Sequence, residues 1–240
     1  MGVINLTPNS FSDGGELKDS SSLINRLNQF GPVDALDIGA ESTAPMNASI
    51  SSDEEWERVS PYLDWILTQK PLISFDTYHP ETIFKIAALW PKDRPLIWND
   101  VSGKFDHHVE RYLRMRRDFH YVFCHNLAPT RELSGRHMDY LSDTLDLWSY
   151  FSPHQHPQVI FDPCLGFSKT YEQNWMILDG FTELQMKYPR WLLGFSRKSF
   201  LRKRFNLEVG DREELDRVHA EIAKKFGNGL WVRTHRPELL

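Results

Sequence analysis

The sequence has few cysteines, little net charge and no long apolar run. Its two cysteines, Cys124 and Cys164, are too few for a disulfide framework and lack the spacing of a metal site. We therefore expect a reducing, cytoplasmic location. The formal net charge of −5 argues against nonspecific binding to nucleic acid. Because no apolar run approaches the roughly 18 residues of a membrane span, we expect no insertion into a membrane.

The chain also lacks the features that divide a protein into domains. It contains no linker, internal repeat or low-complexity segment, and its content of 40% hydrophobic and 25% charged residues is ordinary for a globular protein. A chain of 240 residues has the length of one large domain. We therefore expect a single domain over residues 1–240.

What the sequence does contain is a regular series of short apolar runs, each of which ends in polar residues. Stretches of helical pattern lie between them, at Asp53–Leu67, Pro80–Leu89 and Leu215–Phe226. This alternation predicts parallel strands with crossover helices, and eight such units predict a closed (β/α)8 TIM barrel. The predicted strands are Met1–Ile4, Val33–Ile38, Pro71–Phe75, Pro95–Trp98, Phe119–Cys124, Gln158–Phe161, Trp191–Phe195 and Gly229–Val232.

Polar side chains stand at one end only of these predicted strands. One aspartate after a strand is usually a turn or cap residue, whereas eight polar ends on one edge of a barrel indicate a binding site. The barrel architecture places the active site where strands end and loops begin. The residues concerned are Asn5, Asp37, Asp76, Asn99, His125, Asp162, Lys198 and Arg233.

Seven motifs in order make the sequence resemble the dihydropteroate synthase family from end to end. They are MGVINLTPNSFSDGG, DIGAESTAP, ISFDTYHPE, IWNDVSG, FDPCLGFSKTYEQN, GFSRKSF and VRTH. The resemblance implies a pterin-binding barrel and an enzyme, a transferase of an alkyl group other than methyl. In this family the amine of p-aminobenzoate displaces pyrophosphate from dihydropterin pyrophosphate with Mg²⁺, which yields dihydropteroate for folate biosynthesis. The implied partners are these two small substrates.

The resemblance also implies roles for individual residues. A pterin presents an N–H beside an amino group, and a carboxylate accepts both hydrogen bonds, which is the role that the motif implies for Asp162. The other implied pterin contacts are Asp76, Asn99, Phe167 and Lys198. The implied catalytic set, which stabilises the departing pyrophosphate, is Asn5, Lys198, Arg233 and His235, with Asn5 also holding Mg²⁺. The implied p-aminobenzoate contacts are Phe11, Thr43, Pro45 and Ser199.

The sequence departs from the family pattern at several places. Ala44 stands where the family usually has arginine, and Asn9 where it commonly has aspartate. These departures leave open a second hypothesis, a non-catalytic or impaired pterin-binding paralogue that acts as a carrier or interaction subunit. A third, a methyltransferase barrel that uses methyltetrahydrofolate, is disfavoured by SRKSF and the STAP loop.

The ends of the sequence also differ from the family pattern, which has an N-terminal hairpin and an eighth helix. Without that helix, we expect apolar surface where the last strand meets the first, at Val3, Ile4, Leu230 and Val232. A homodimer or a partner chain over this seam would cover it. The alternative is cover from within the chain by Trp231 and Phe226.

Overall fold

The computed structural model describes residues 1–6, 26–41, 49–126, 141–227 and 229–240. Eight parallel strands form one sheet in the order β1 to β8, so each strand neighbours the next along the chain. All eight predicted strands are confirmed, with ends that differ by up to two residues. They are β1 (Gly2–Asn5), β2 (Ala35–Gly39), β3 (Leu72–Asp76), β4 (Leu96–Asp100), β5 (Phe119–Cys124), β6 (Val159–Asp162), β7 (Trp191–Leu193) and β8 (Leu230–Val232).

Hydrogen bonds between the last and first strands close the sheet into a barrel. Thr234, just beyond β8, forms a parallel bridge with Gly2. The Val3 amide donates to the Thr234 carbonyl at 3.0 Å, and the Thr234 amide donates to the Met1 carbonyl at 3.0 Å. The predicted TIM barrel is therefore confirmed.

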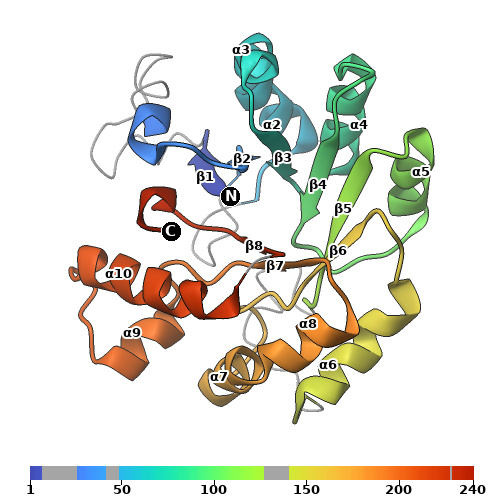
Figure 1. Cartoon of the computed structure of the whole chain (residues 1–240). Helices are drawn as coiled ribbons and strands as arrows, with labels where there is room; N and C mark the ends of the chain where they lie inside the picture. Colours follow the sequence, from blue (N-terminus) through green and yellow to red (C-terminus); the bar gives the residue numbers. More distant parts are fainter. Residues whose placement is uncertain (7–25, 42–48, 127–140, 228) are drawn as a thin grey trace.

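Helices surround the strands on the outside of the barrel (Figure 1). They are α2 (Ser52–Val59), α3 (Leu63–Thr68), α4 (Pro80–Leu89), α5 (His107–Met115), α6 (Thr144–Phe151), α7 (Tyr171–Asp179), α8 (Phe181–Lys187), α9 (Ser199–Phe205) and α10 (Arg212–Ala223). The helix predicted over Asp53–Leu67 is interrupted by a 3₁₀ turn, Ser60–Tyr62, because Pro61 lacks the amide proton of a continuous helix. Among the described residues, no helix is long and apolar enough to traverse a bilayer.

Side-chain caps set several helix starts. Asp106 accepts hydrogen bonds from the amides of His108 and Val109 at the start of α5. Thr170 and Gln173 form a capping box, which starts α7 at Tyr171. The cap therefore fixes where the loop between β6 and α7 ends.

The two-residue period of the strands builds an apolar barrel floor beneath a polar opening, which we call the mouth. Interior residues pack together as one buried cluster that includes Ala35, Ile97, Val122, Ile160 and Leu192. Two residues further along, at the carboxyl ends of the strands, the same interior face carries Asp37, Asn99, Cys124, Asp162 and Gly194. A second, larger apolar cluster lies between the strands and the helices.

The expectation of exposed apolar surface at the seam is wrong for the first strand. Val3 is 5% exposed and Ile4 is 2% exposed. Phe30, itself 1% exposed, covers the outer face that Gly2 and Ile4 share, and its ring lies so close to Gly2 that an added Cβ would sit 2.8 Å from it, whereas Val3 points to the opposite face. Phe226 instead packs against Phe181, with ring centroids 5.4 Å apart. A residue far from both strand motifs therefore covers this part of the seam.

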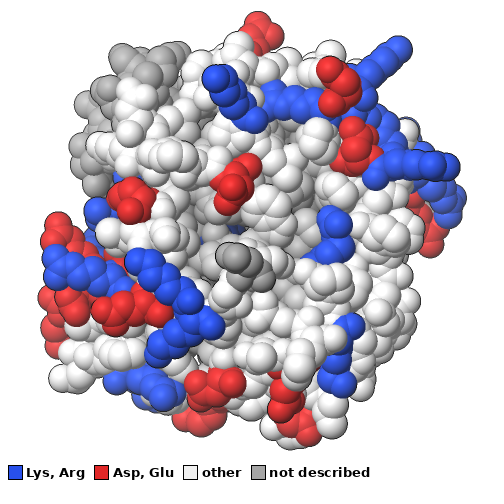
Figure 2. Space-filling model, in the orientation of Figure 1, with Lys and Arg blue, Asp and Glu red and all other residues white. Residues whose placement is uncertain are grey.

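Charged residues of both signs are interspersed over the outer helices on the face drawn in Figure 2. The centre of that face is largely uncharged (Figure 2). No region of one sign dominates it, as expected for a chain whose formal net charge is only −5.

Candidate active site

Asp37 is the centre of a buried hydrogen-bond network on one side of the mouth. Its carboxylate accepts from Ser74 Oγ at 2.6 Å and from Asn99 Nδ2 at 3.2 and 3.1 Å. Arg233 Nε donates to the same carboxylate at 2.5 Å. The Asp37 side chain is fully buried, and these partners come from β3, β4 and the end of β8. Asp37 thus joins four strand ends and has little capacity left for a ligand.

Arg233 also contacts a second carboxylate, since its Nη2 atom lies 2.6 Å from Asp76 Oδ2. Burial would lower the pKa of Arg233, but Asp37 and Asp76 raise it above its ordinary value. Burial raises the pKa of Asp76 to about 7, against the attraction of Arg233 and with the help of the Asp37 charge. Because burial outweighs the attraction of Arg233, the pKa of Asp76 lies near neutral pH.

Asp162 lies across the barrel from Asp37 and has far fewer partners. Its Oδ1 atom accepts from the Cys164 amide at 2.7 Å. Its Oδ2 atom has only the weak thiol donor of Cys124, at 3.9 Å, and no cation of the described residues forms an ion pair with it. Burial raises the pKa of Asp162 to about 6. This carboxylate keeps acceptor capacity for a ligand.

Lys198 and Phe167 lie together beside Asp162. The Lys198 ammonium is 3.9 Å from the centroid of the Phe167 ring, a cation–π contact. Gly166 makes the approach possible, because a Cβ there would lie 2.9 Å from Lys198 Cδ. Burial lowers the pKa of Lys198. Two of the predicted pterin contacts therefore lie side by side in one wall of the mouth.

An ion pair holds the loop that carries Lys198. Arg197 adopts a left-handed conformation, with φ of 61°. Its guanidinium donates to both carboxylate oxygens of Asp216 on α10, at 2.9 and 2.8 Å. Asp216 is only 2% exposed. This bidentate contact stabilises a backbone conformation that is costly for arginine.

His235 lies beyond the last strand and bonds the loop after β7. Its Nδ1 atom is 3.0 Å from Ser196 Oγ, and its amide donates to the same oxygen at 3.3 Å. Burial lowers the pKa of His235 well below its ordinary value, and Arg197 and Arg233 lower it further. The lowered pKa favours the neutral imidazole, which offers one N–H donor, so His235 contributes a hydrogen bond and not a positive charge.

Glu41 connects both sides of the segment 42–48 to the strand β3 end. It accepts from Tyr78 Oη at 2.7 Å and from the Ile50 amide at 3.2 Å. The predicted p-aminobenzoate residues Thr43 and Pro45 fall within this segment and lie outside the described residues, as do Phe11, Asn9 and Ala44.

The remaining predicted residues lie at the carboxyl ends of the strands. Asn5 ends β1, and no described residue bonds its side chain. Ser199 begins α9, next to Lys198. In the described part of the chain, no three His, Cys, Asp or Glu side chains group in a way that would hold a metal ion. Asn99 keeps its Oδ1 atom as an acceptor, because its Nδ2 atom is bonded to Asp37.

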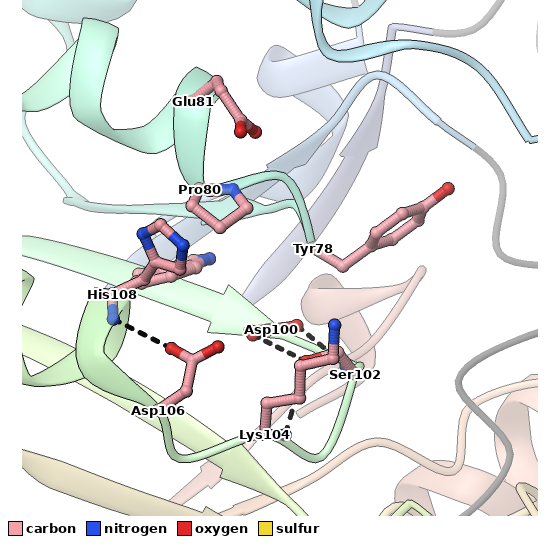
Figure 3. A pocket seen from close by; sticks show the side chains of 9 residues that line it. Tyr78, Pro80, Glu81, Asp100, Ser102, Lys104, Asp106 and His108 are labelled. Atoms are coloured by element: carbon pink, nitrogen blue, oxygen red, sulfur yellow. Dashed lines mark hydrogen bonds between the residues drawn. The ribbon is translucent and has the colours of Figure 1, made fainter.

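A cavity of about 250 Å³ opens beside the mouth rather than in it. It lies on the outer side of β4, where Asp100 bonds Ser102, and Tyr78 and Pro80 form another wall (Figure 3). None of the predicted site residues lines this cavity. We therefore place the candidate site at the mouth, where the perturbed acids and cations converge.

Sequence reasoning missed two residues of this region. Asp37 was recognised as a polar strand end but received no role, although it joins four strands. Lys169 was not singled out, although it lies in the same motif as Asp162 and Phe167 and is only 7% exposed. The available signal is a lysine inside this motif that stands directly before the helix cap Thr170.

Comparisons with known proteins agree with this geometry. The family model described as pterin binding enzyme matches residues 1–235. The mitochondrial folate synthesis bifunctional protein of Pisum sativum is 32% identical over an alignment of 245 positions, which covers 93% of this chain and 47% of that protein. The chain thus spans about half the length of this bifunctional relative.

Relatives of more similar length are monofunctional. The dihydropteroate synthase of Clostridium beijerinckii is 31% identical over an alignment of 221 positions, which covers 89% of this chain and 80% of that protein. A crystal structure of the dihydropteroate synthase from Clostridium difficile, determined in the presence of pteroic acid, superposes with a TM-score of 0.78 and 28% identity, covering 99% of this chain and 90% of that one. The chain therefore belongs to the pterin-binding enzymes, and within them to the dihydropteroate synthase family.

Proposed function

We propose that this protein condenses dihydropterin pyrophosphate with p-aminobenzoate to dihydropteroate and releases pyrophosphate, a step of folate biosynthesis. The observation that carries the proposal is Asp162, a buried carboxylate with unused acceptor capacity in a mouth whose other interior acids are paired. Full-length similarity to synthases supports catalysis over a carrier without turnover.

The pterin is bound by acceptors that the protein's own hydrogen bonds leave available in the mouth. The Asp162 carboxylate accepts from the amino group and the ring N–H of the pterin, so both donors find charge-assisted partners there. Asn99 Oδ1 accepts a further ring hydrogen. Asp76, whose pKa is about 7, presents either a donor or an acceptor to a ring nitrogen, according to its protonation.

The departing pyrophosphate is stabilised by donors from the end of β8 and the loop after β7. Arg233 and Lys198 supply positive charge, and His235 supplies one N–H as a neutral hydrogen-bond donor. These groups are preplaced by Asp37 and Ser196, so they need little reorganisation as negative charge develops on the leaving oxygen. No side-chain nucleophile is needed, because the amine of p-aminobenzoate attacks the exocyclic carbon directly.

Asn5 is the proposed protein ligand of Mg²⁺. Magnesium commonly takes one or two protein oxygens together with substrate phosphates and water, so a single side-chain oxygen from Asn5 fits this mode of binding. The Asn5 side chain has no bonding partner among the described residues and is free to serve. When bound, the ion would neutralise charge on the leaving pyrophosphate.

The amine substrate is proposed to bind next to Lys198. Ser199 is the described residue of that pocket, at the start of α9. We assign Phe11, Thr43 and Pro45 to the same p-aminobenzoate pocket from their sequence motifs alone.

We also propose that the chain forms a homodimer in a reducing, cytoplasmic compartment. Leu145 on α6 is 54% exposed and Met186 on α8 is 77% exposed, and Thr144 bonds Glu183 between these two helices. Burial of this face between two copies would remove both side chains from water. Light scattering that gives a 28.2 kDa particle at micromolar concentration would refute the dimer.

Both cysteines are free and buried, which suits a reducing compartment.

Pyrophosphate release is the direct test of the proposed reaction. Purified protein with dihydropterin pyrophosphate, p-aminobenzoate and Mg²⁺ should release pyrophosphate in proportion to the dihydropteroate formed. Omission of p-aminobenzoate should abolish the signal, and Asp162→Asn should lower kcat/KM at least tenfold. Tight pterin binding without any pyrophosphate release would instead identify a carrier.

A further inference from the structure

Lys169 is a buried lysine that bonds only backbone carbonyls. Its side chain belongs to a residue that is 7% exposed, in the loop between β6 and α7. Its Nζ atom donates to the carbonyls of His125 at 2.8 Å, Phe167 at 3.1 Å and Cys164 at 3.3 Å. An ammonium has three donors, and all three are used. A buried cation without a carboxylate in contact needs a reason, because its desolvation is costly.

The loop that surrounds this ammonium has an unusual backbone. Cys164, Gly166 and Ser168 have φ of 54°, 82° and 51°, so every second residue is left-handed. Two of the three are not glycine, and such conformations persist only when other contacts hold them. The carbonyls of Cys164 and Phe167 converge on the same Nζ atom. The ammonium therefore occupies the place at which a bound monovalent cation would gather these oxygens.

The loop around Lys169 contacts two residues of the proposed pterin site, Asp162 and Phe167, which we call the pterin wall. Asp162 accepts from the amide of Cys164, whose carbonyl is bonded to Lys169. Phe167, whose carbonyl Lys169 also binds, carries the ring beneath Lys198. The bond to the His125 carbonyl connects the loop to the end of β5.

We propose that Lys169 is a positioning residue for pterin binding, which holds Asp162 and Phe167 in place through the loop that carries them. This inference rests on the proposed function, since it concerns the same pterin wall. Lys169 itself does not touch the pterin in this scheme, because its three donors are already bonded within the protein.

The positive charge of Lys169 also acts on the Asp162 carboxylate, which it keeps in the ionised form. Burial raises the pKa of Asp162 to about 6, and the charges of Lys169, Lys198 and Arg233 oppose that rise. Burial lowers the pKa of Lys169 to about 8, against the Cys164 and Cys124 thiols and Asp162, while Lys198 lowers it further. The imidazole of His125 is neutral, because burial and then Lys169 lower its pKa to about 2. Loss of the Lys169 charge thus moves the pKa of Asp162 further upward.

The test compares two substitutions at Lys169 with a matched control. Lys169→Met removes the donors and the charge, whereas Lys169→Gln removes the charge and keeps an N–H donor. Lys203→Met removes an exposed lysine whose ammonium lies 4.3 Å from the Tyr171 ring centroid, at the start of α7. The probe is 6-hydroxymethylpterin, and its affinity is measured by calorimetry between pH 5 and 8.

We expect Lys169→Met to weaken binding at least tenfold at pH 7.5 and Lys203→Met to change it less than twofold. Both Lys169 variants should also move the acidic midpoint of binding upward by half a pH unit or more, which a purely structural role would not do. An unmoved midpoint, or wild-type affinity in Lys169→Met, overturns the inference. Wild-type protein that binds no pterin at all would instead refute the proposed function.

Chemical rescue provides a second measurement if the first variants unfold. In Lys169→Ala, ammonium ions should restore pterin affinity at least fivefold relative to sodium ions at equal ionic strength. If this variant folds poorly, the melting temperature replaces affinity as the readout, and it should rise with ammonium but not with sodium. The absence of both effects overturns the proposal.

Discussion

Asp37 and Asp162 occupy equivalent places on opposite sides of the barrel, yet their surroundings differ. Each is an interior carboxylate at the end of a strand. Asp37 accepts hydrogen bonds from Ser74, Asn99 and Arg233, whereas Asp162 has one backbone amide and one distant thiol. The first carboxylate stabilises the scaffold and the second is available to a ligand. The number of internal partners, and not the residue type or its position on the strand, separates the two roles.

The neighbouring strands explain the difference. Asp37 lies next to strands that end in side chains with strong donors. Asp162 lies between Cys124, a weak donor, and Gly194, where an added Cβ would sit 3.9 Å from Asp162 Oδ2. Small or weakly polar neighbours therefore leave room and acceptor capacity around Asp162.

The largest expected effect is on folding, at Asp37. Asp37→Ala should lower the free energy of unfolding by about 3–5 kcal/mol, because Arg233 and Asn99 lose a shared partner in a buried site. Urea denaturation followed by circular dichroism measures this change. Asp162→Ala is the matched control and should lower the free energy of unfolding far less. Equal losses for the two variants would contradict the division into a structural carboxylate, Asp37, and a ligand-binding carboxylate, Asp162.

Binding should show the opposite ranking. Asp162→Asn should weaken pterin binding by about 2–4 kcal/mol, because the new amide places a donor against the donors of the ligand. Calorimetry with 6-hydroxymethylpterin at pH 7.5 gives the value. A loss below about 1 kcal/mol would mean that another group recognises the pterin edge.

The pH dependence of stability sharpens the comparison. The pKa of Asp162 is raised from 3.8 to about 6, so its folded form holds a proton that the unfolded chain has lost. The stability linked to that proton is complete below about pH 4 and is lost as the pH rises past about 6. Empty Asp162→Asn should therefore be more stable than the wild type at pH 8, by up to roughly 3 kcal/mol, and similar to it at pH 4. Thermal melts at both pH values test this, and a difference that grows toward acid pH would contradict it.

The smallest effect is expected at His235. Replacement of this neutral donor by alanine should weaken the binding of the pyrophosphorylated pterin by about 1 kcal/mol and leave the binding of free pterin unchanged. Calorimetry with both ligands measures the selectivity. Arg233→Ala is the contrasting variant, because its bonds to Asp37 and Asp76 connect it to the proposed pterin site, and we expect it to affect both ligands. Equal losses for the two ligands in His235→Ala would place this residue elsewhere.

The eight strands and the side on which the site lies were predictable from the sequence. Runs such as Phe119–Cys124 are apolar and end in polar residues, and that pattern is local. The same two-residue period within β4 places Ile97 in the floor of the barrel and Asn99 in its mouth. The motifs predict Asp162, Phe167 and Lys198 as site residues, and the structure brings these three side chains together at the mouth. The covering of the first strand was not predictable, since Phe30 belongs to no motif.

The sequence by itself therefore determined the succession of strands and helices, the floor and mouth of the barrel, and the family. Only the tertiary structure decided which polar residues pair. Arg233 and Asp37 are 196 residues apart in the chain and meet at 2.5 Å, and Lys169 reaches the His125 carbonyl across 44 residues. The physical reason is closure: a local pattern sets which way a side chain points, but the distance to its partner exists only after the last strand has bonded to the first. That distance decides whether a buried carboxylate is saturated, as Asp37 is, or left for a ligand, as Asp162 is.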